Sequence, residues 1–296
     1  MIFNIQNDRL SVTVEDIGAQ IISVKDGAGM EYMWQRDPNI WPRTAPVLFP
    51  VIGRLRNNSY LVNGKEYHMK QHGFARDLPF SVTAQTDTMI IFSVSADEKT
   101  KAEYPYDFTL DICYTLDGAN LLKTHTVTKH SAGEMFFELG GHDGFRVALD
   151  TDESMEDYYI YFEGESTLRP LLKDEDLLYS NERGNIPLDA GKLWLKMDLF
   201  RHDAIVLDQL HSRKVMLGNA RGNRRIGFTF PDFPLLGIWT PDKPLATNFV
   251  CLEAWSSLPD SITAGMELRS KNHICQVNAG EQKIFCYTTN FFCNSK

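Results

Sequence analysis

The sequence predicts an all-β protein, a sandwich or barrel of antiparallel strands with few short helices, on three observations. Apolar and polar residues alternate strictly over residues 106–115, as in a strand with one buried face. Short runs rich in β-branched and aromatic residues recur along the chain, and turn residues separate them at regular spacing. Helical periodicity is scarce.

The individual elements follow in order along the chain. Asn63-Gly64 separates two β-prone runs and predicts a tight hairpin. Residues 96–103 favour a short helix that ends before Pro105, and residues 174–179 favour a further helical turn. Besides the alternating run, strands are predicted at residues 10–14, 21–24, 89–94, 158–162, 205–208, 213–217, 226–230, 236–239, 249–253 and 283–287.

The composition is that of an ordinary globular protein. The chain has 296 residues, of which 43% are hydrophobic and 23% charged, so it is long enough to bury a large core. We find no repeat, low-complexity tract or linker, and therefore expect a single domain over residues 1–296. The net charge of −9 opposes binding to the phosphate backbone of nucleic acids. Nothing in the pattern indicates an oligomeric state.

Cysteines and apolar segments bear on the cellular compartment. The cysteines are Cys113, Cys251, Cys275, Cys286 and Cys293. They are odd in number, scattered and without a CxxC pair, so we expect reduced thiols rather than disulfides or a structural zinc site. We see no secretory signal before the first β-prone run and no apolar stretch that approaches the length of a membrane span. We therefore expect a cytoplasmic protein.

A histidine framed by glycines is the first candidate for chemistry. His142 lies in the segment GGHDG (residues 140–144), directly after the β-prone run 135–139. A strand that ends in glycines leaves room for a ligand to approach the backbone. Imidazole gives up and recovers a proton near physiological pH, which suits proton transfer. The alternative is a turn histidine without a catalytic role.

A second histidine and a glutamate have similar settings. His72 lies in the segment QHGFAR (residues 71–76); the alternative is a buried histidine satisfied by the backbone. Glu253 ends the apolar run 249–252, where burial would raise the pKa of the carboxyl and suit a general base. The alternative is a glutamate at the edge of a sheet. Trp255, two residues further, is placed to stack against the apolar face of a sugar.

Two arginines and an aspartate complete the candidates for binding. Arg54 ends the segment FPVIGR (residues 49–54), and Arg76 follows His72 by four residues. A guanidinium offers planar, forked donors that suit vicinal hydroxyls or a phosphate; surface ion pairing is the alternative. Asp208 ends a strand-like run, where a structural role is the alternative.

Several common site motifs do not occur in the sequence. The chain has no HExxH spacing, GxSxG elbow, P-loop or dinucleotide fingerprint. We therefore expect no metal site.

Four segments in order carry a resemblance to a known family: FPVIGR (residues 49–54), QHGFAR (71–76), GGH (140–142) and CLEAW (251–255). In these the chain resembles the aldose 1-epimerase (galactose mutarotase-like) superfamily, most of all its LacX-like branch, over nearly its whole length. The resemblance implies a large antiparallel β-sandwich, the galactose mutarotase-like supersandwich, with a concave sugar-binding face. It also implies that the α and β anomers of an aldose are interconverted without a cofactor.

The resemblance also implies a role for each catalytic candidate. Glu253 is similar in position to the general base that takes the proton from the anomeric hydroxyl, and His142 to the general acid that protonates the ring oxygen. His72 and Arg54 are similar to the ligands that orient the sugar. The family uses an aspartate for sugar hydroxyls, and Asp208 is the positional candidate for it. The small-molecule partner implied is a sugar.

The sequence departs from the family at two neighbours of the candidate residues. Asp143 follows His142, and Ala254 follows Glu253, where the family commonly has proline. We expect Asp143 to pair with His142 and to raise the pKa of the imidazole.

Three other functions stay open beside an epimerase of free aldoses. The first is an epimerase of a sugar phosphate, with Arg54 or Arg76 meeting the phosphate. The second is a catalytically silent sugar-binding or sensor protein, and the third is a structural β-sandwich without a ligand. An intact set of His72, His142 and Glu253 favours the enzyme.

Overall fold

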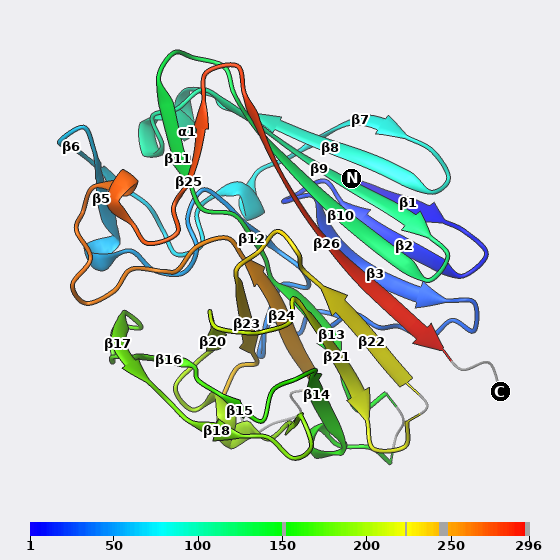
Figure 1. Cartoon of the computed structure of the whole chain (residues 1–296). Helices are drawn as coiled ribbons and strands as arrows, with labels where there is room; N and C mark the ends of the chain where they lie inside the picture. The colour runs from blue at the N-terminus through cyan, green and yellow to red at the C-terminus, as the bar shows by residue number, and fades with distance from the viewer. Residues whose placement is uncertain (150–151, 223, 243–247, 294–296) are drawn as a thin grey trace.

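The computed structural model describes residues 1–149, 152–222, 224–242 and 248–293. Within these residues the strands form two large antiparallel sheets, with smaller sheets around them (Figure 1). The larger, nine-stranded sheet runs in the order β19 (Lys192–Trp194), β14 (Tyr158–Phe162), β21 (Lys214–Asn219), β22 (Arg224–Thr229), β26 (Gln282–Cys293), β10 (Asn120–Lys129), β9 (Phe108–Asp117), β8 (Met89–Ser95) and β7 (Ser81–Gln85).

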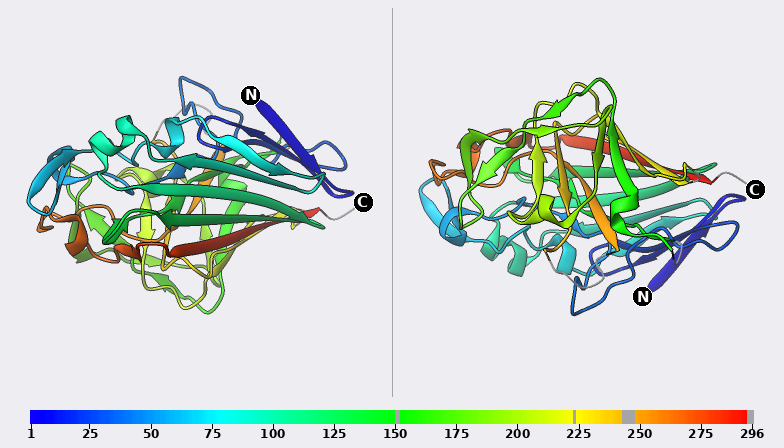
Figure 2. Two further views of the ribbon diagram at one scale, coloured as in Figure 1. Left: turned by 90° about the horizontal axis from the view of Figure 1, so that it is seen from above. Right: turned by 90° about the horizontal axis from the view of Figure 1, so that it is seen from below.

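The second large sheet has six strands in the described part of the chain. It is ordered β20 (Ile205–Leu207), β23 (Leu235–Trp239), β24 (Phe249–Trp255), β12 (Gly140–Gly141) and β4 (Val47–Leu48), and β13 (Asp143–Arg146) also pairs with β24. Views from above and from below show opposite faces of the molecule, with β9, β10 and β26 towards the viewer in the first and the green strands of the region from β14 to β18 (Ile186–Pro187) in the second (Figure 2).

The remaining elements surround these two sheets. One small sheet joins β1 (Ile2–Gln6), β2 (Leu10–Glu15) and β3 (Gln20–Asp26), and paired strands are β5 (Ser59–Val62) with β6 (Lys65–His68), β11 (Glu134–Phe137) with β25 (Cys275–Asn278), β15 (Thr167–Leu168) with β18 (Ile186–Pro187), and β16 (Leu171–Lys173) with β17 (Tyr179–Arg183). Helical segments are α1 (Glu98–Glu103) and the 3₁₀ turns η1 (Arg56–Asn58), η2 (Ala75–Asp77), η3 (Met155–Asp157), η4 (Met197–Phe200) and η5 (Leu268–Ser270).

The main core lies between the two large sheets. Ile112 and Phe228 from the nine-stranded sheet share one buried cluster with Val250 and Leu252 of β24. A second, smaller apolar cluster, which includes Trp255, covers the other face of the six-stranded sheet. All seven residues of β24 are therefore buried. Since side chains alternate along a strand, the even-numbered residues of β24 enter the main core and the odd-numbered ones, among them Trp255, point to the opposite face of the sheet.

The predicted all-β fold is confirmed, and the elements agree with it in detail. The alternation at 106–115 lies in β9, whose buried positions are Phe108, Leu110, Ile112, Tyr114 and Leu116. The hairpin at Asn63-Gly64 joins β5 to β6, with positive φ at both turn residues. The short helix is α1, which Asp97 caps at its N-terminus by accepting a hydrogen bond from the Thr100 amide at 2.7 Å.

The helical turn predicted at residues 174–179 is wrong. The chain makes a tight turn there between β16 and β17. The Asp174 carboxylate accepts hydrogen bonds from the amides of Asp176 at 3.0 Å and Leu178 at 2.9 Å. Leu177 has a φ of 64°, which a right-handed helix does not allow. Hydrogen bonds from the backbone to the Asp174 side chain stabilise a turn here instead of a helix.

Two further expectations concern thiols and membrane spans. The cysteines whose side chains are described, Cys113, Cys251, Cys275 and Cys286, are free thiols. None of the helices in the described residues is long and apolar enough to cross a membrane.

Candidate active site

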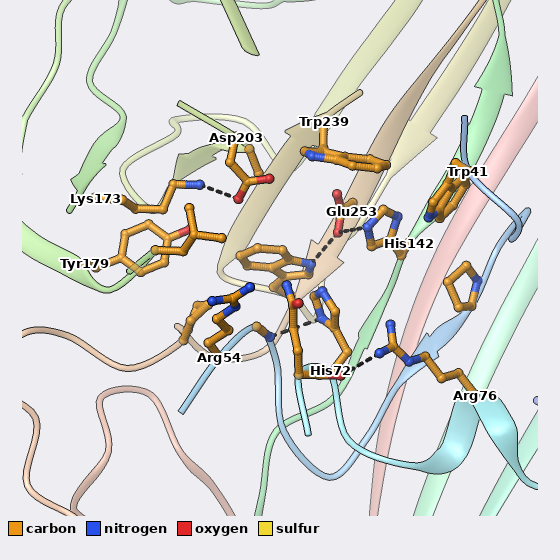
Figure 3. A pocket seen from close by; sticks show the side chains of 17 residues that line it. Trp41, Arg54, His72, Arg76, His142, Lys173, Tyr179, Asp203, Trp239 and Glu253 are labelled. Atoms are coloured by element: carbon orange, nitrogen blue, oxygen red, sulfur yellow. Dashed lines mark hydrogen bonds and ion pairs between the residues drawn. The ribbon is translucent and has the colours of Figure 1, made fainter. Parts of the chain in front are cut away.

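One pocket gathers nearly all of the residues singled out from the sequence. It has a volume of about 230 Å³ and opens on the face of the six-stranded sheet that lies away from the main core. Figure 3 shows the side chains that line it. The pocket brings together six of the predicted residues: Arg54, His72, Arg76, His142, Glu253 and Trp255.

The centre of the pocket is a carboxylate beside an imidazole. Glu253 stands on the pocket face of β24, and His142 lies between β12 and β13, which pair with β24 on one side. The Nε2 atom of His142 is 3.4 Å from Oε2 of Glu253, which also accepts a hydrogen bond from Trp255 Nε1 at 3.1 Å (Figure 3). In the described residues, Oε1 of Glu253 and Nδ1 of His142 are buried without a hydrogen-bond partner. A buried pair with unused polar atoms is ready to receive a polar ligand.

Burial sets the charge of this pair. It raises the pKa of Glu253 well above the usual value, and the charge of Asp203 adds to the effect. It lowers the pKa of His142 to about 3, with the charge of Arg76 as the next cause. Over a wide range of pH the two groups therefore hold one proton between them, and the pair carries no net charge.

Aromatic rings hold the imidazole and wall the pocket. Trp41 stacks on His142 with ring centroids 5.0 Å apart and an interplanar angle of 28°. Trp239 meets the same imidazole edge-on at 5.3 Å. Both indoles line the pocket together with Trp255. Such rings suit the C–H faces of a sugar while leaving its hydroxyls to polar groups.

His72 is positioned by an unusual backbone. Its φ is 66°, and the following Gly73 has a φ of 70° and lies against the backbone of Phe49. An added Cβ at Gly73 would sit 2.2 Å from the Phe49 carbonyl oxygen, so only glycine fits there. The Gly53 amide donates to Nδ1 of His72 at 3.1 Å, which leaves the ring proton on Nε2 as a donor. Burial lowers the pKa of His72 well below its usual value, so this donor is neutral.

The two arginines flank His72 in Figure 3. Arg54 is exposed at the pocket wall. Arg76 donates to the carbonyl of Gln71 at 2.6 Å, while its Nε is buried and has no hydrogen-bond partner in the described residues. Burial, followed by the charge of Arg43, lowers the pKa of Arg76 to about 10. The guanidinium is therefore still charged at neutral pH and has an unused donor.

A second ion pair in the pocket is not predicted by any sequence motif. Lys173 and Asp203 meet at 2.8 Å, beside Tyr179 (Figure 3). Lys173 ends β16, and Asp203 lies with a φ of 67° in the turn before β20. The two residues lie in segments without any motif, and only the tertiary structure brings them together.

Asp208 lies outside this pocket. It follows β20 and forms a two-pronged ion pair with Arg183, with distances of 2.7 and 2.9 Å. Together these residues line a neighbouring polar groove.

The expected pair between Asp143 and His142 does not form. The carboxylate of Asp143 lies 2.5 Å from Nζ of Lys123 and accepts a hydrogen bond from the Tyr287 hydroxyl at 3.4 Å. Neighbouring residues of an extended chain point to opposite faces, so Asp143 enters the main core while His142 enters the pocket. Lys123 and Asp143 are both buried, and they form an ion pair directly behind the site.

A third buried histidine next to this ion pair makes stability depend on pH. His125 on β10 stacks on Tyr287, with ring centroids 5.7 Å apart. Burial, and secondly the charge of Lys123, lowers the pKa of His125 to about 3. A folded pKa below the unfolded value of 6.5 gives stability that is present above pH 6.5 and is lost as the pH falls towards 3.

We therefore expect acid to destabilise the wild type more than a His125→Gln variant. Between pH 7 and pH 4 the wild type should lose on the order of 3 kcal/mol more of its free energy of unfolding. Urea unfolding at several pH values, followed by tryptophan fluorescence, measures the two curves. All other ionisable groups are common to the two proteins, so their effects cancel. Parallel curves would contradict the prediction, because His125 would then take up a proton as readily in the folded protein as in the unfolded one.

No three His, Cys, Asp or Glu side chains converge as a possible metal site anywhere in the described residues.

The chain is similar in sequence and in fold to members of a known protein family. A family model described as Aldose 1-epimerase matches residues 1–273. The plasmid-encoded protein LacX of Lactococcus lactis subsp. lactis is 33% identical over 94% of this chain and 95% of its own.

Solved structures show the same similarity. A galactose mutarotase related enzyme from Lactobacillus acidophilus is 33% identical, with 99% of this chain and 97% of that chain covered and a TM-score of 0.93. A galactose mutarotase-like protein from Lactobacillus casei is 28% identical, with coverages of 99% and 100% and a TM-score of 0.90. The chain therefore belongs to the aldose 1-epimerase family and has the galactose mutarotase-like fold.

Proposed function

We propose that this protein is an aldose 1-epimerase, which interconverts the α and β anomers of a sugar by opening and reclosing its ring. The observation that carries the proposal is the buried pair of Glu253 and His142, 3.4 Å apart. The anomeric hydroxyl and the ring oxygen are bonded to one carbon atom, so an acid and a base that serve them must lie close together. The pair also holds the single proton that the reaction requires.

The proposed reaction moves two protons and breaks one bond. Burial places the shared proton on Glu253, and transfer of this proton to His142 prepares the pair for the reaction. The Glu253 carboxylate then takes the proton of the anomeric hydroxyl while His142 protonates the ring oxygen. The bond between the anomeric carbon and the ring oxygen breaks and leaves an open-chain aldehyde. Rotation about the C1–C2 bond presents the other face of the aldehyde. The same groups then act in reverse, and the ring closes as the other anomer.

Neighbouring groups support this chemistry. The Nε2–H of His72 and the guanidinium of Arg54 are donors that orient hydroxyls and steady the charge that develops on oxygen. Trp41 and Trp239 exclude water from the pair and offer apolar faces to the sugar ring.

Polarimetry of freshly dissolved α-glucose and α-galactose tests the proposal. We expect the purified protein to speed the approach to the equilibrium rotation in proportion to its concentration. A boiled sample and a buffer blank give the spontaneous rate. Saturable sugar binding without acceleration would contradict the proposal and leave a binding or sensor protein.

A sugar phosphate is the second candidate substrate, for the same reaction. The observation that favours it is Arg76, a half-buried cation in the pocket whose buried Nε is an unused donor. Glucose 6-phosphate should then have a higher kcat/KM than glucose, and Arg76→Gln should remove that preference while the glucose rate is kept. Equal kcat/KM values for the two sugars would leave the free aldose as the substrate.

A further inference from the structure

A buried cluster of charges lies against the backbone segment that carries Arg54. Its members are Glu138, between β11 and β12, and Asp260 and Lys271, before and after η5. Lys271 pairs with Asp260 and lies 3.1 Å from Oε1 of Glu138. Two carboxylates therefore share one ammonium group, and each of the three residues is less than a tenth exposed.

Burial makes this cluster unfavourable as a source of stability. It raises the pKa of Glu138 above its usual value, and the charge of Lys271 opposes that shift. Apolar side chains of similar volume often stabilise a protein at least as well as buried charges do. Stability alone therefore does not explain the cluster, and its contacts with the backbone indicate another role.

The two carboxylates hold the backbone on both sides of Arg54. Oε2 of Glu138 accepts a hydrogen bond from the Ile52 amide at 2.6 Å. Oδ2 of Asp260 accepts one from the Arg56 amide at 2.9 Å, and the Asp260 amide donates to the Arg54 carbonyl at 3.2 Å. The ammonium group that the carboxylates share fixes these two anchors relative to each other.

The same segment controls where His72 carries its ring proton. The Gly53 amide, next to that of Ile52, donates to Nδ1 of His72 at 3.1 Å, and the His72 amide donates to the Gly53 carbonyl at 2.9 Å. An Ile52 amide without an acceptor would be a costly buried donor, and the backbone would turn to pair it. Such a turn would carry the Gly53 amide away from the imidazole and free Nδ1 to hold the proton.

We propose that Glu138 is a positioning residue for the catalytic pocket. Through the backbone of Ile52 and Gly53, it confines the ring proton of His72 to Nε2. Through the same backbone it fixes the place of Arg54 in the pocket wall. Glu138 is fully buried and does not itself line the pocket, so it acts through these neighbours and not on the sugar. The effect on turnover rests on the proposed function, whereas the effect on the imidazole does not.

Two substitutions of Glu138 separate the reach of its side chain from its charge. Glu138→Asp keeps a negative charge for Lys271 but is one methylene too short to meet the Ile52 amide. Glu138→Gln keeps the length and an oxygen for that amide but has no charge, and Lys271 retains Asp260 as its partner. We expect the aspartate variant to disturb the pocket and the glutamine variant to leave it as in the wild type.

Nitrogen NMR of protein labelled with ¹⁵N in its histidines measures the tautomer of His72, because protonated and unprotonated ring nitrogens differ widely in chemical shift. A His72→Gln variant assigns the signals. In the wild type at pH 7, Nε2 should be protonated and Nδ1 unprotonated. Glu138→Asp should place part of the proton on Nδ1, and Glu138→Gln should not.

Polarimetry of glucose measures the effect on turnover. Glu138→Asp should lower kcat/KM by up to about 10²-fold, the loss that follows when a group is misplaced by about 1 Å. Glu138→Gln should stay near the wild type. The matched control is Glu153→Asp, because Glu153 has a side chain that is 1% exposed and accepts a hydrogen bond from the Tyr158 hydroxyl at 2.6 Å, away from the pocket lining. This control should keep both the tautomer and the rate.

Failure of the positioning role and failure of the proposed function give different results. A ring proton confined to Nε2 in Glu138→Asp, or an equal mixture of tautomers in Glu153→Asp, overturns the positioning role. A glutamine variant as disturbed as the aspartate variant also overturns it, because the reach to the Ile52 amide would then not matter. A wild type that does not speed mutarotation contradicts the epimerase, and the tautomer of His72 then decides the role of Glu138 by itself.

Discussion

Replacing Glu253 by glutamine is expected to lower the kcat/KM of sugar mutarotation by about 10²–10⁴-fold, the usual contribution of a positioned proton-transfer group. Glutamine has nearly the same volume and keeps an oxygen that can accept the hydrogen bond of Trp255 Nε1. It cannot take a proton from the anomeric hydroxyl. Polarimetry over a series of sugar concentrations measures the loss.

Two controls separate chemistry from folding in this experiment. A neutral amide is cheaper to bury than a carboxylate, so Glu253→Gln should unfold at the same temperature as the wild type or higher. His142→Gln should cause a similar loss of rate. The double variant should be no slower than the worse single variant, because the two groups act as one unit. A Glu253→Gln protein with wild-type kcat/KM would rule out Glu253 as the base.

Breaking the ion pair behind the site should have the largest effect on stability. Lys123→Met leaves the Asp143 carboxylate buried without its cation, which costs about 3–5 kcal/mol of the free energy of unfolding. Urea unfolding followed by tryptophan fluorescence measures it. The cost comes from the uncompensated charge rather than from lost attraction, because removing two charges from water is itself expensive.

The double variant Lys123→Met with Asp143→Leu tests that reason. Replacing both charges by apolar side chains should recover most of the lost stability, since no charge is then left unpaired. If both single variants and the double variant lose the same free energy, packing rather than charge explains the effect. A Lys123→Met protein within about 1 kcal/mol of the wild type would contradict the prediction altogether.

The sequence predicts strands best where a buried face is apolar. β9 has such a face, and its alternation predicts the strand. The sequence of the neighbouring β10 does not predict a strand. The buried face of β10 contains Lys123, His125 and Lys129 between apolar residues. Polar side chains on the inner face reverse the pattern that indicates a strand, because periodicity assumes that polar residues face water.

The residues of the candidate site also differ in whether the local sequence identifies them. His142 and Glu253 lie in short motifs that local sequence displays, so they could be named before the structure. Lys173 comes from the end of β16 and Asp203 from the turn before β20, and they meet only through the fold. The prediction for Asp143 is wrong because residues adjacent in sequence need not be in contact. In a strand the adjacent residue points away, and the partner of Asp143 lies on another sheet.

The pairing of β12 and β13 with β24 has a consequence for folding. It aligns Gly140 with Trp255 and Asp143 with Leu252, and so joins segments more than a hundred residues apart in sequence. Closing such long loops is slow, because chain entropy is lost before the contacts form. The two groups that share a proton therefore meet only once the distant halves of the chain have found each other. A chain in which these strands are unpaired has no complete site, so activity returns during refolding only after this long-range pairing has formed.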